Sequence, residues 1–250
     1  MSNPRAALFN AAINEERQSM GANKKTARLA GLLYLISVVT GVFSLMYVPS
    51  QTSGQGDTAA AVAHIINAEP LYRLGIAAGA VDYAIFLLLP LVLYKLLSSV
   101  NRSAAVTMVA LALASVPLDF IALSTQLDIL SLLDGAKYRG LLSSEQLQAN
   151  AMLLLDSYHN RIAIAELFWG LWLFPFGYLV YKSGFLPRIL GVLLMIGCFS
   201  YLITFFGQTL FPDLAIPGFV MLPVMFAELG TCMWLLIVGA REPLRGGGLA

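Results

Sequence analysis

Six apolar runs, each roughly 20 residues long or longer, recur along the chain and limit what it can fold into. A helix rises about 1.5 Å per residue, so about 20 apolar residues are enough to cross the hydrocarbon core of a bilayer. We therefore predict an all-α, polytopic membrane protein built as a bundle of six transmembrane helices. The predicted spans are 29–48, 71–97, 104–127, 161–181, 186–210 and 218–239.

Composition agrees with this class and excludes others. Only 12% of the residues are charged and 58% are hydrophobic, whereas a soluble domain usually carries about 25% charged residues. The net charge of +1 makes no electrostatic case for a nucleic-acid partner. The two cysteines, Cys198 and Cys232, both fall inside predicted spans, so neither a disulfide framework nor a zinc site is suggested.

The orientation follows from the hairpin 181–188, YKSGFLPR, which joins two apolar runs. Gly184 can supply the turn and Pro187 can open the next helix, and Lys182 and Arg188 flank the turn. Basic residues beside short loops mark the cytoplasmic side of a membrane. With both termini cytoplasmic, 11 of the 15 basic residues lie inside, namely Arg5, Arg17, Lys24, Lys25, Arg28, Lys95, Arg102, Lys182, Arg188, Arg241 and Arg245.

Outside the spans, the sequence predicts two terminal segments and two short helices. Residues 1–28 form a polar cytoplasmic arm, 29–240 the membrane domain and 241–250 a cytoplasmic tail. Asp57 can cap a short helix in the first loop, and Ser143 with Gln146 has the spacing of a capping box that opens a helix in the third loop. Both short helices are expected on the extracytoplasmic side.

Several stretches carry a family resemblance: KKTARLAGLLYL, AAAVAHIINAEPLYRLGIAAG and, above all, YLVYKSGFLPRILGVLL. They resemble the domain-of-unknown-function-4386 family of prokaryotic integral membrane proteins, over about 24–239 of the chain. The resemblance implies a six-helix protein of a bacterial or archaeal cell membrane, and it brings no established activity, cofactor or site residue. The third span departs from the family pattern, which often has an arginine there, because ALASVPLDF carries Pro117 and Asp119 instead.

Four carboxylates lie inside the predicted spans, where a charge is costly and often marks function. Helical rise places all four between the extracytoplasmic surface and the midplane, and further polar residues lie at the same outer level. We predict a polar pocket that opens to the extracytoplasmic side. Its candidate residues are Asp82, Asp119, Glu166 and Glu228, with Arg73, His159, Arg161 and Gln126 toward its mouth.

Two classes of function remain open. In the first, the protein binds or transports a small molecule or an ion through this pocket, and the buried acids could exchange protons. In the second, it is a non-transporting sensor or structural subunit whose acids pair with Arg73 or Arg161, or stay protonated, and only fix helix packing. The first predicts a water-filled cavity at the acids, and the second a dry bundle.

An enzyme is not favoured, because no GxSxG, HExxH, P-loop or dinucleotide-binding pattern occurs. With only two histidines, a three-histidine metal site is impossible. No cofactor is expected, and the one firm partner is the lipid bilayer.

Overall fold

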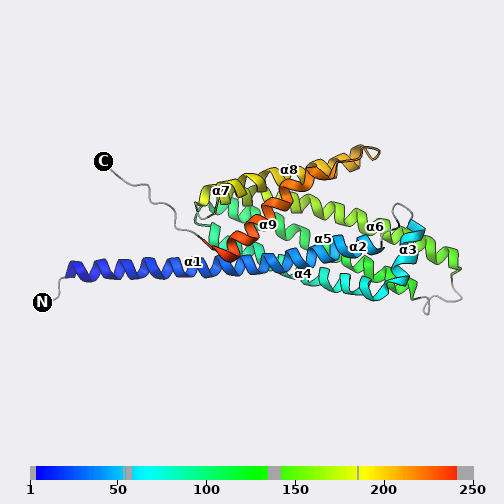
Figure 1. The fold of residues 1–250 in the computed structure, drawn as a ribbon, viewed down its shortest axis with the longest axis horizontal. Coiled ribbons are helices and arrows are strands. Elements are labelled where there is room, and N and C mark those ends of the chain that lie inside the picture. The colour runs from blue at the N-terminus through cyan, green and yellow to red at the C-terminus, as the bar shows by residue number, and fades with distance from the viewer. Residues whose placement is uncertain (1–3, 53, 55–57, 135–141, 185, 241–250) are drawn as a thin grey trace.

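Helices make up the fold of the computed structural model, which describes residues 4–52, 54, 58–134, 142–184 and 186–240. Six of them are long and apolar enough to cross a membrane, which confirms the predicted class. They run back and forth along one long axis (Figure 1). The helices of the first half are α1 (Pro4–Val42), η1 (Phe43–Tyr47), α2 (Val48–Thr52), α3 (Thr58–Asn67), α4 (Glu69–Leu97) and α5 (Arg102–Leu133).

The second half contains three further membrane-crossing units. They are α6 (Ser144–Leu171) followed by α7 (Leu173–Ser183), then α8 (Arg188–Leu210), and finally η2 (Gly218–Met221) followed by α9 (Leu222–Ile237). Chain reversals at α4–α5 and α7–α8 lie at the same end of the bundle, which we call the basic end after its Lys95, Arg102, Lys182 and Arg188 (Figure 1). The other end is called the far end.

Local sequence signals account for several helix ends. Ser143 Oγ accepts from the Gln146 N–H at 3.2 Å and Gln146 Oε1 accepts from the Ser143 N–H at 2.9 Å, so the predicted capping box is confirmed. Asn101 caps α5 in a similar way, with its side chain accepting from the Ala104 N–H at 3.0 Å. Gly184 ends α7 at φ 67°, in the left-handed region that suits a glycine turn.

Several helices are longer than the spans predicted from hydropathy. The helix that contains the first span, α1, already begins at Pro4, and α5 continues beyond 127 to Leu133. Helix α6 starts at Ser144 and runs without a loop into the fourth span. The reason is physical: hydropathy marks where lipid ends, whereas a helix continues until its backbone hydrogen bonds are capped or broken. The added turns of α5 and α6 project past the far end of α8, whereas those of α1 extend beyond the basic end (Figure 1).

At the far end, α3 packs onto these added turns. Val62 of α3 is buried in one apolar cluster with Leu132 of α5 and Ala151 of α6. Ile65 is also buried, whereas Ile66 stays 53% exposed, so one side of this short helix faces protein. The predicted cap residue of this helix, Asp57, lies outside the described residues.

Two larger apolar clusters fill the bundle. The basic-end core includes Leu89, Leu93, Ala112, Trp172, Leu173 and Phe176. The far core includes Tyr72, Tyr83, Ala122, Ile129, Leu155 and Tyr158.

Close helix contacts hold the bundle together where glycines leave room. A Cβ on Gly31 of α1 would collide with the backbone of Leu236 in α9, and a Cβ on Gly177 of α7 would lie 2.5 Å from the Gly191 carbonyl oxygen of α8. Large apolar side chains cover the outside of the bundle, as expected for contact with a lipid bilayer. Examples are Leu32, Val39, Leu88, Ile121, Ile196, Phe199 and Ile203.

Candidate functional site

Two of the predicted acids, Asp119 and Glu166, lie at the junction of the two cores, while Asp82 borders the far core and Glu228 the basic-end core. In α5, the basic-end core ends at Ala112 and the far core begins at Ala122, with Asp119 between them. Along α6 and α7 the far core reaches Tyr158 and the basic-end core starts at Trp172, so Glu166 also falls in between. We call Asp82, Asp119, Glu166 and Glu228, with the hydroxyl groups around them, the polar layer.

Asp82 of α4 is held against α1. It is only 8% exposed, and the Ser37 hydroxyl of α1 donates a hydrogen bond to its Oδ1. One turn further along α1, a Cβ on Gly41 would lie 2.9 Å from Asp82 Oδ2. The absence of a side chain at Gly41 therefore makes room for the carboxyl group between the two helices.

Asp119 of α5 is fully buried, with 0% exposure. The hydroxyl of Ser115, one turn before it, donates to Oδ2 at 3.1 Å. Oδ1 finds no hydrogen-bond partner among the described residues, although the indole of Trp169 lies close to this carboxyl group. An unpartnered buried acceptor is costly, by about 1–3 kcal/mol, so this oxygen is available to a proton or a ligand.

Glu228 of α9 and Glu166 of α6 are partly buried and share tyrosine neighbours. The hydroxyl of the buried Tyr34 in α1 lies near Glu228 without forming a hydrogen bond of good geometry. Tyr201 of α8 lies within electrostatic reach of both glutamates. A Cβ on Gly170, four residues after Glu166, would lie 2.5 Å from the Cβ of Tyr201, so α6 and α8 are in close contact there.

Three of the four acids interact electrostatically through Asp82, and Glu166 is linked to them only through Tyr201. Asp82 lies within electrostatic reach of both Asp119 and Glu228. Tyr201 lies within electrostatic reach of both Glu228 and Glu166. Among the described residues, no ion pair joins any of the four acids to a basic side chain; the ion pair present is Arg73 with Glu69, at 2.7 Å on the surface. The layer is therefore rich in carboxyl groups and has no paired cation.

The predicted mouth residues separate into two pairs. Arg73 points to Glu69 on the surface, and His159 is exposed beside the Tyr158 ring. The other two, Arg161 and Gln126, face the bundle. Arg161 donates to the Thr125 hydroxyl and lies 3.5 Å from the Ile121 carbonyl oxygen, and Gln126 is buried next to the Tyr72 hydroxyl.

Sequence reasoning missed the hydroxyl neighbours of the acids. Ser115 could have been found, because a residue four positions before Asp119 shares its helix face. Ser37, Tyr34 and Tyr201 carry no such signal, since each lies on a different helix from the acid that it meets.

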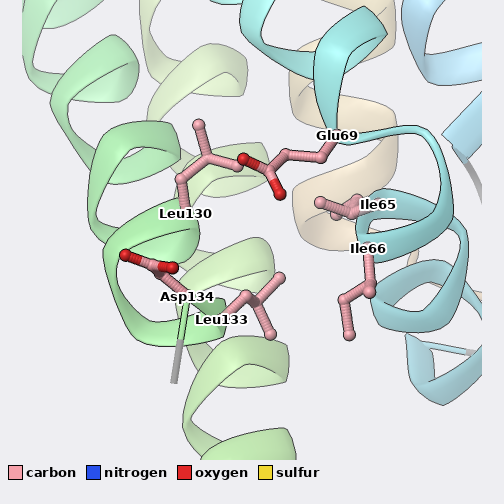
Figure 2. A pocket seen from close by; sticks show the side chains of 6 residues that line it. All are labelled: Ile65, Ile66, Glu69, Leu130, Leu133 and Asp134. Carbon is pink, nitrogen blue, oxygen red and sulfur yellow. The ribbon is translucent and has the colours of Figure 1, made fainter. Parts of the chain in front are cut away.

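The small cavity that the structure describes lies elsewhere. It measures about 30 Å³ and is lined by Ile65, Ile66, Glu69, Leu130, Leu133 and Asp134. Figure 2 shows the Glu69 and Asp134 carboxylates over an apolar surface between α3, α4 and α5. A space of this size suits about one water molecule. It belongs to the far end and does not reach the polar layer.

The four acids of the polar layer are carried by separate helices. Within the part of the chain that the structure describes, no three His, Cys, Asp or Glu side chains converge in a way that could hold a metal. The acids instead come from four different helices, each with hydroxyl or aromatic neighbours. Carboxyl groups spaced in this way can take up and release protons singly.

Comparison with known proteins adds the family and no activity. An uncharacterized protein from Archaeoglobus fulgidus is 31% identical over 90 residues, which cover 35% of this chain and 51% of that protein. The chain thus matches about half the length of this curated relative. No solved structure matches the chain. The model of the family described as Domain of unknown function (DUF4386) matches residues 29–239, and the chain therefore belongs to that family.

Proposed function

We propose that this membrane protein takes up and releases a small cationic species, in the first place the proton, at the polar layer. The observation that carries the proposal is the set of four carboxyl groups inside the bundle, three of them in mutual electrostatic reach through Asp82, with no basic partner among the described residues. Burying a carboxylate alone in an apolar interior is costly, so such a group holds either a proton or another cation.

The proposal includes access from the far end. The far core carries polar groups along its length: Tyr72, Tyr158, Thr125 and Gln126, with Arg161 beside them. Among the described residues, the basic-end side has fewer buried polar side chains, namely Tyr34, Thr231 and Ser183. Hydrating a route to the acids therefore costs less free energy from the far end than from the basic end. Basic residues collect on the cytoplasmic side of membrane proteins, so the far end is the extracytoplasmic one in this proposal.

Infrared difference spectroscopy after a pH jump tests the proposal on purified protein in lipid. We expect carboxyl bands that change with pH, part of which Asp119→Asn and Glu228→Gln remove. Asp213→Asn, an exposed carboxyl in the α8–α9 connection, serves as the matched control and should remove only a solvent-exposed signal. Spectra in which neither interior variant removes a band would refute proton uptake at the polar layer.

A purely structural role is the second candidate, and one contact favours it. The Ser37–Asp82 hydrogen bond joins α1 to α4, as a packing device would. If packing is the whole role, the pH-jump spectrum of Asp82→Asn should equal that of the unmodified protein, while its thermal stability falls.

A further inference from the structure

Three aromatic rings stack directly below the polar layer, on its basic-end side. The Phe86 and Trp172 rings meet edge to face with centroids 5.3 Å apart, and the Trp172 and Phe176 rings lie parallel with centroids 5.1 Å apart. Trp172 is 1% and Phe176 0% exposed. We call these three residues the aromatic stack.

The position of the stack follows from helix spacing. Phe86 lies four residues after Asp82 in α4, which is about one turn toward the basic end. Trp172 lies three residues after Trp169, the residue whose indole is close to Asp119. The stack therefore lies about one helical turn from Asp82, on the side of the polar layer that faces the basic end.

Both helices that carry the stack lack a backbone hydrogen bond beside it. A proline has no N–H, so the carbonyl four residues earlier is left without its helical partner. Pro90 has this effect on the Phe86 carbonyl, and Pro175 on that of Leu171. The fourth membrane-crossing unit is also interrupted at this place: α6 ends at Leu171 and α7 begins at Leu173.

The segment beyond this interruption is a tight hairpin. In α7 and α8, Gly177 and Gly191 bring the two backbones together so closely that a Cβ on either would lie 2.5–2.6 Å from a backbone atom of the other helix. The Arg188 guanidinium also lies 5.7 Å from the Tyr181 ring centroid across the turn. The start of α7 can therefore bend while the hairpin keeps its internal packing.

We propose that the aromatic stack is the gate between the polar layer and the basic end, and that it opens when the α7–α8 hairpin bends at Trp172. This inference rests on the proposed function, because a gate has a role only if the acids exchange a species with water. Proline-weakened helices are the usual places where a helix kinks. The gate is closed in this structure, since two of its three rings are fully buried.

Proton entry into lipid vesicles that contain the protein and a trapped pH dye tests the gate. Trp172→Ala should acidify the vesicle interior several-fold faster than the unmodified protein after the outside is acidified, and Trp172→Phe should stay slow because it keeps a ring. Phe174→Ala is the matched control: Phe174 lies on the same helix, 45% exposed, in an edge-to-face pair with Phe199 at 6.1 Å. Adding Asp119→Asn to Trp172→Ala should abolish the excess flux.

The outcomes separate the gate from the proposed function. A Trp172→Ala protein no faster than Phe174→Ala, or a leak that Asp119→Asn leaves intact, overturns the gate while the pH-jump carboxyl bands can persist. Loss of those bands from the unmodified protein's spectrum overturns the proposed function instead. If Trp172→Ala does not fold, Phe86→Ala removes the edge-to-face contact alone and must show the same leak.

Discussion

Glycines at helix crossings decide how closely the helices of this bundle approach. At Gly31 the backbones of α1 and α9 meet, and the Cys232 thiol lies 3.7 Å from the Gly31 carbonyl oxygen at the same crossing. The contact keeps Tyr34, one turn along α1, beside Glu228 of α9. A single missing side chain thus sets the geometry of one side of the polar layer.

Substitution of this glycine should separate the two helices. We expect Gly31→Ala to lower the free energy of unfolding by about 1–3 kcal/mol, since the new Cβ meets backbone that cannot move aside. Gly218→Ala is the control, because a Cβ there would meet nothing within 4 Å, and it should stay within about 0.5 kcal/mol. Thermal unfolding in detergent measures both; equal stability of the two variants would contradict the close crossing.

At the residue scale, sequence spacing can indicate partners that share a helix but not partners on different helices. The acids were identified because a charged side chain inside an apolar span is costly in free energy. Ser115 could have been added from its spacing to Asp119. The partner of Asp82 could not, because Ser37 and Asp82 are 45 residues apart and meet only through the packing of α1 against α4.

Among the helices, α6 shows most clearly how a local signal sets an element. Its capping box satisfies backbone N–H groups at the first turn, so the helix starts 17 residues before the predicted start of the fourth span at 161. Its far-end half then packs Ala151 and Leu155 against protein. The helix ends at Leu171, and α7 begins at Leu173 with Pro175 in its first turn.

Removal of the cap should loosen only the start of α6. Ser143→Ala is expected to cost about 1 kcal/mol, the usual value of an N-cap side chain. The first turn of α6 should then exchange its amide hydrogens faster, as measured by mass spectrometry. Ser131→Ala, which removes an exposed hydroxyl bonded to the Leu127 carbonyl oxygen, is the control and should leave exchange in α6 unchanged. Equal amide exchange in the two variants would mean that the capping box does not stabilise the first turn of α6.

At the scale of the whole molecule, the orientation in the membrane remains a prediction. Cysteines introduced at 148 and 213 should react with a membrane-impermeant thiol reagent added outside the cell, and cysteines at 99 and 103 should not. All four positions are exposed, two at each end of the bundle. The two free cysteines, Cys198 and Cys232, would first be replaced by Ala, so that only the introduced thiols can react. The reverse labelling pattern would invert the proposed orientation and with it the side of access.

The sequence alone determined that this chain is a six-helix membrane protein and which carboxyl groups lie inside it, because span length, hydropathy and the cost of buried charge act on each segment separately. Only the tertiary structure decided that Asp119 and Glu166 lie between two apolar cores, that Arg73 and His159 face away from the acids, and that Phe86, Trp172 and Phe176 stack on the basic-end side of the layer. These features depend on how the helices rotate and cross, which is set by contacts between residues far apart in the chain.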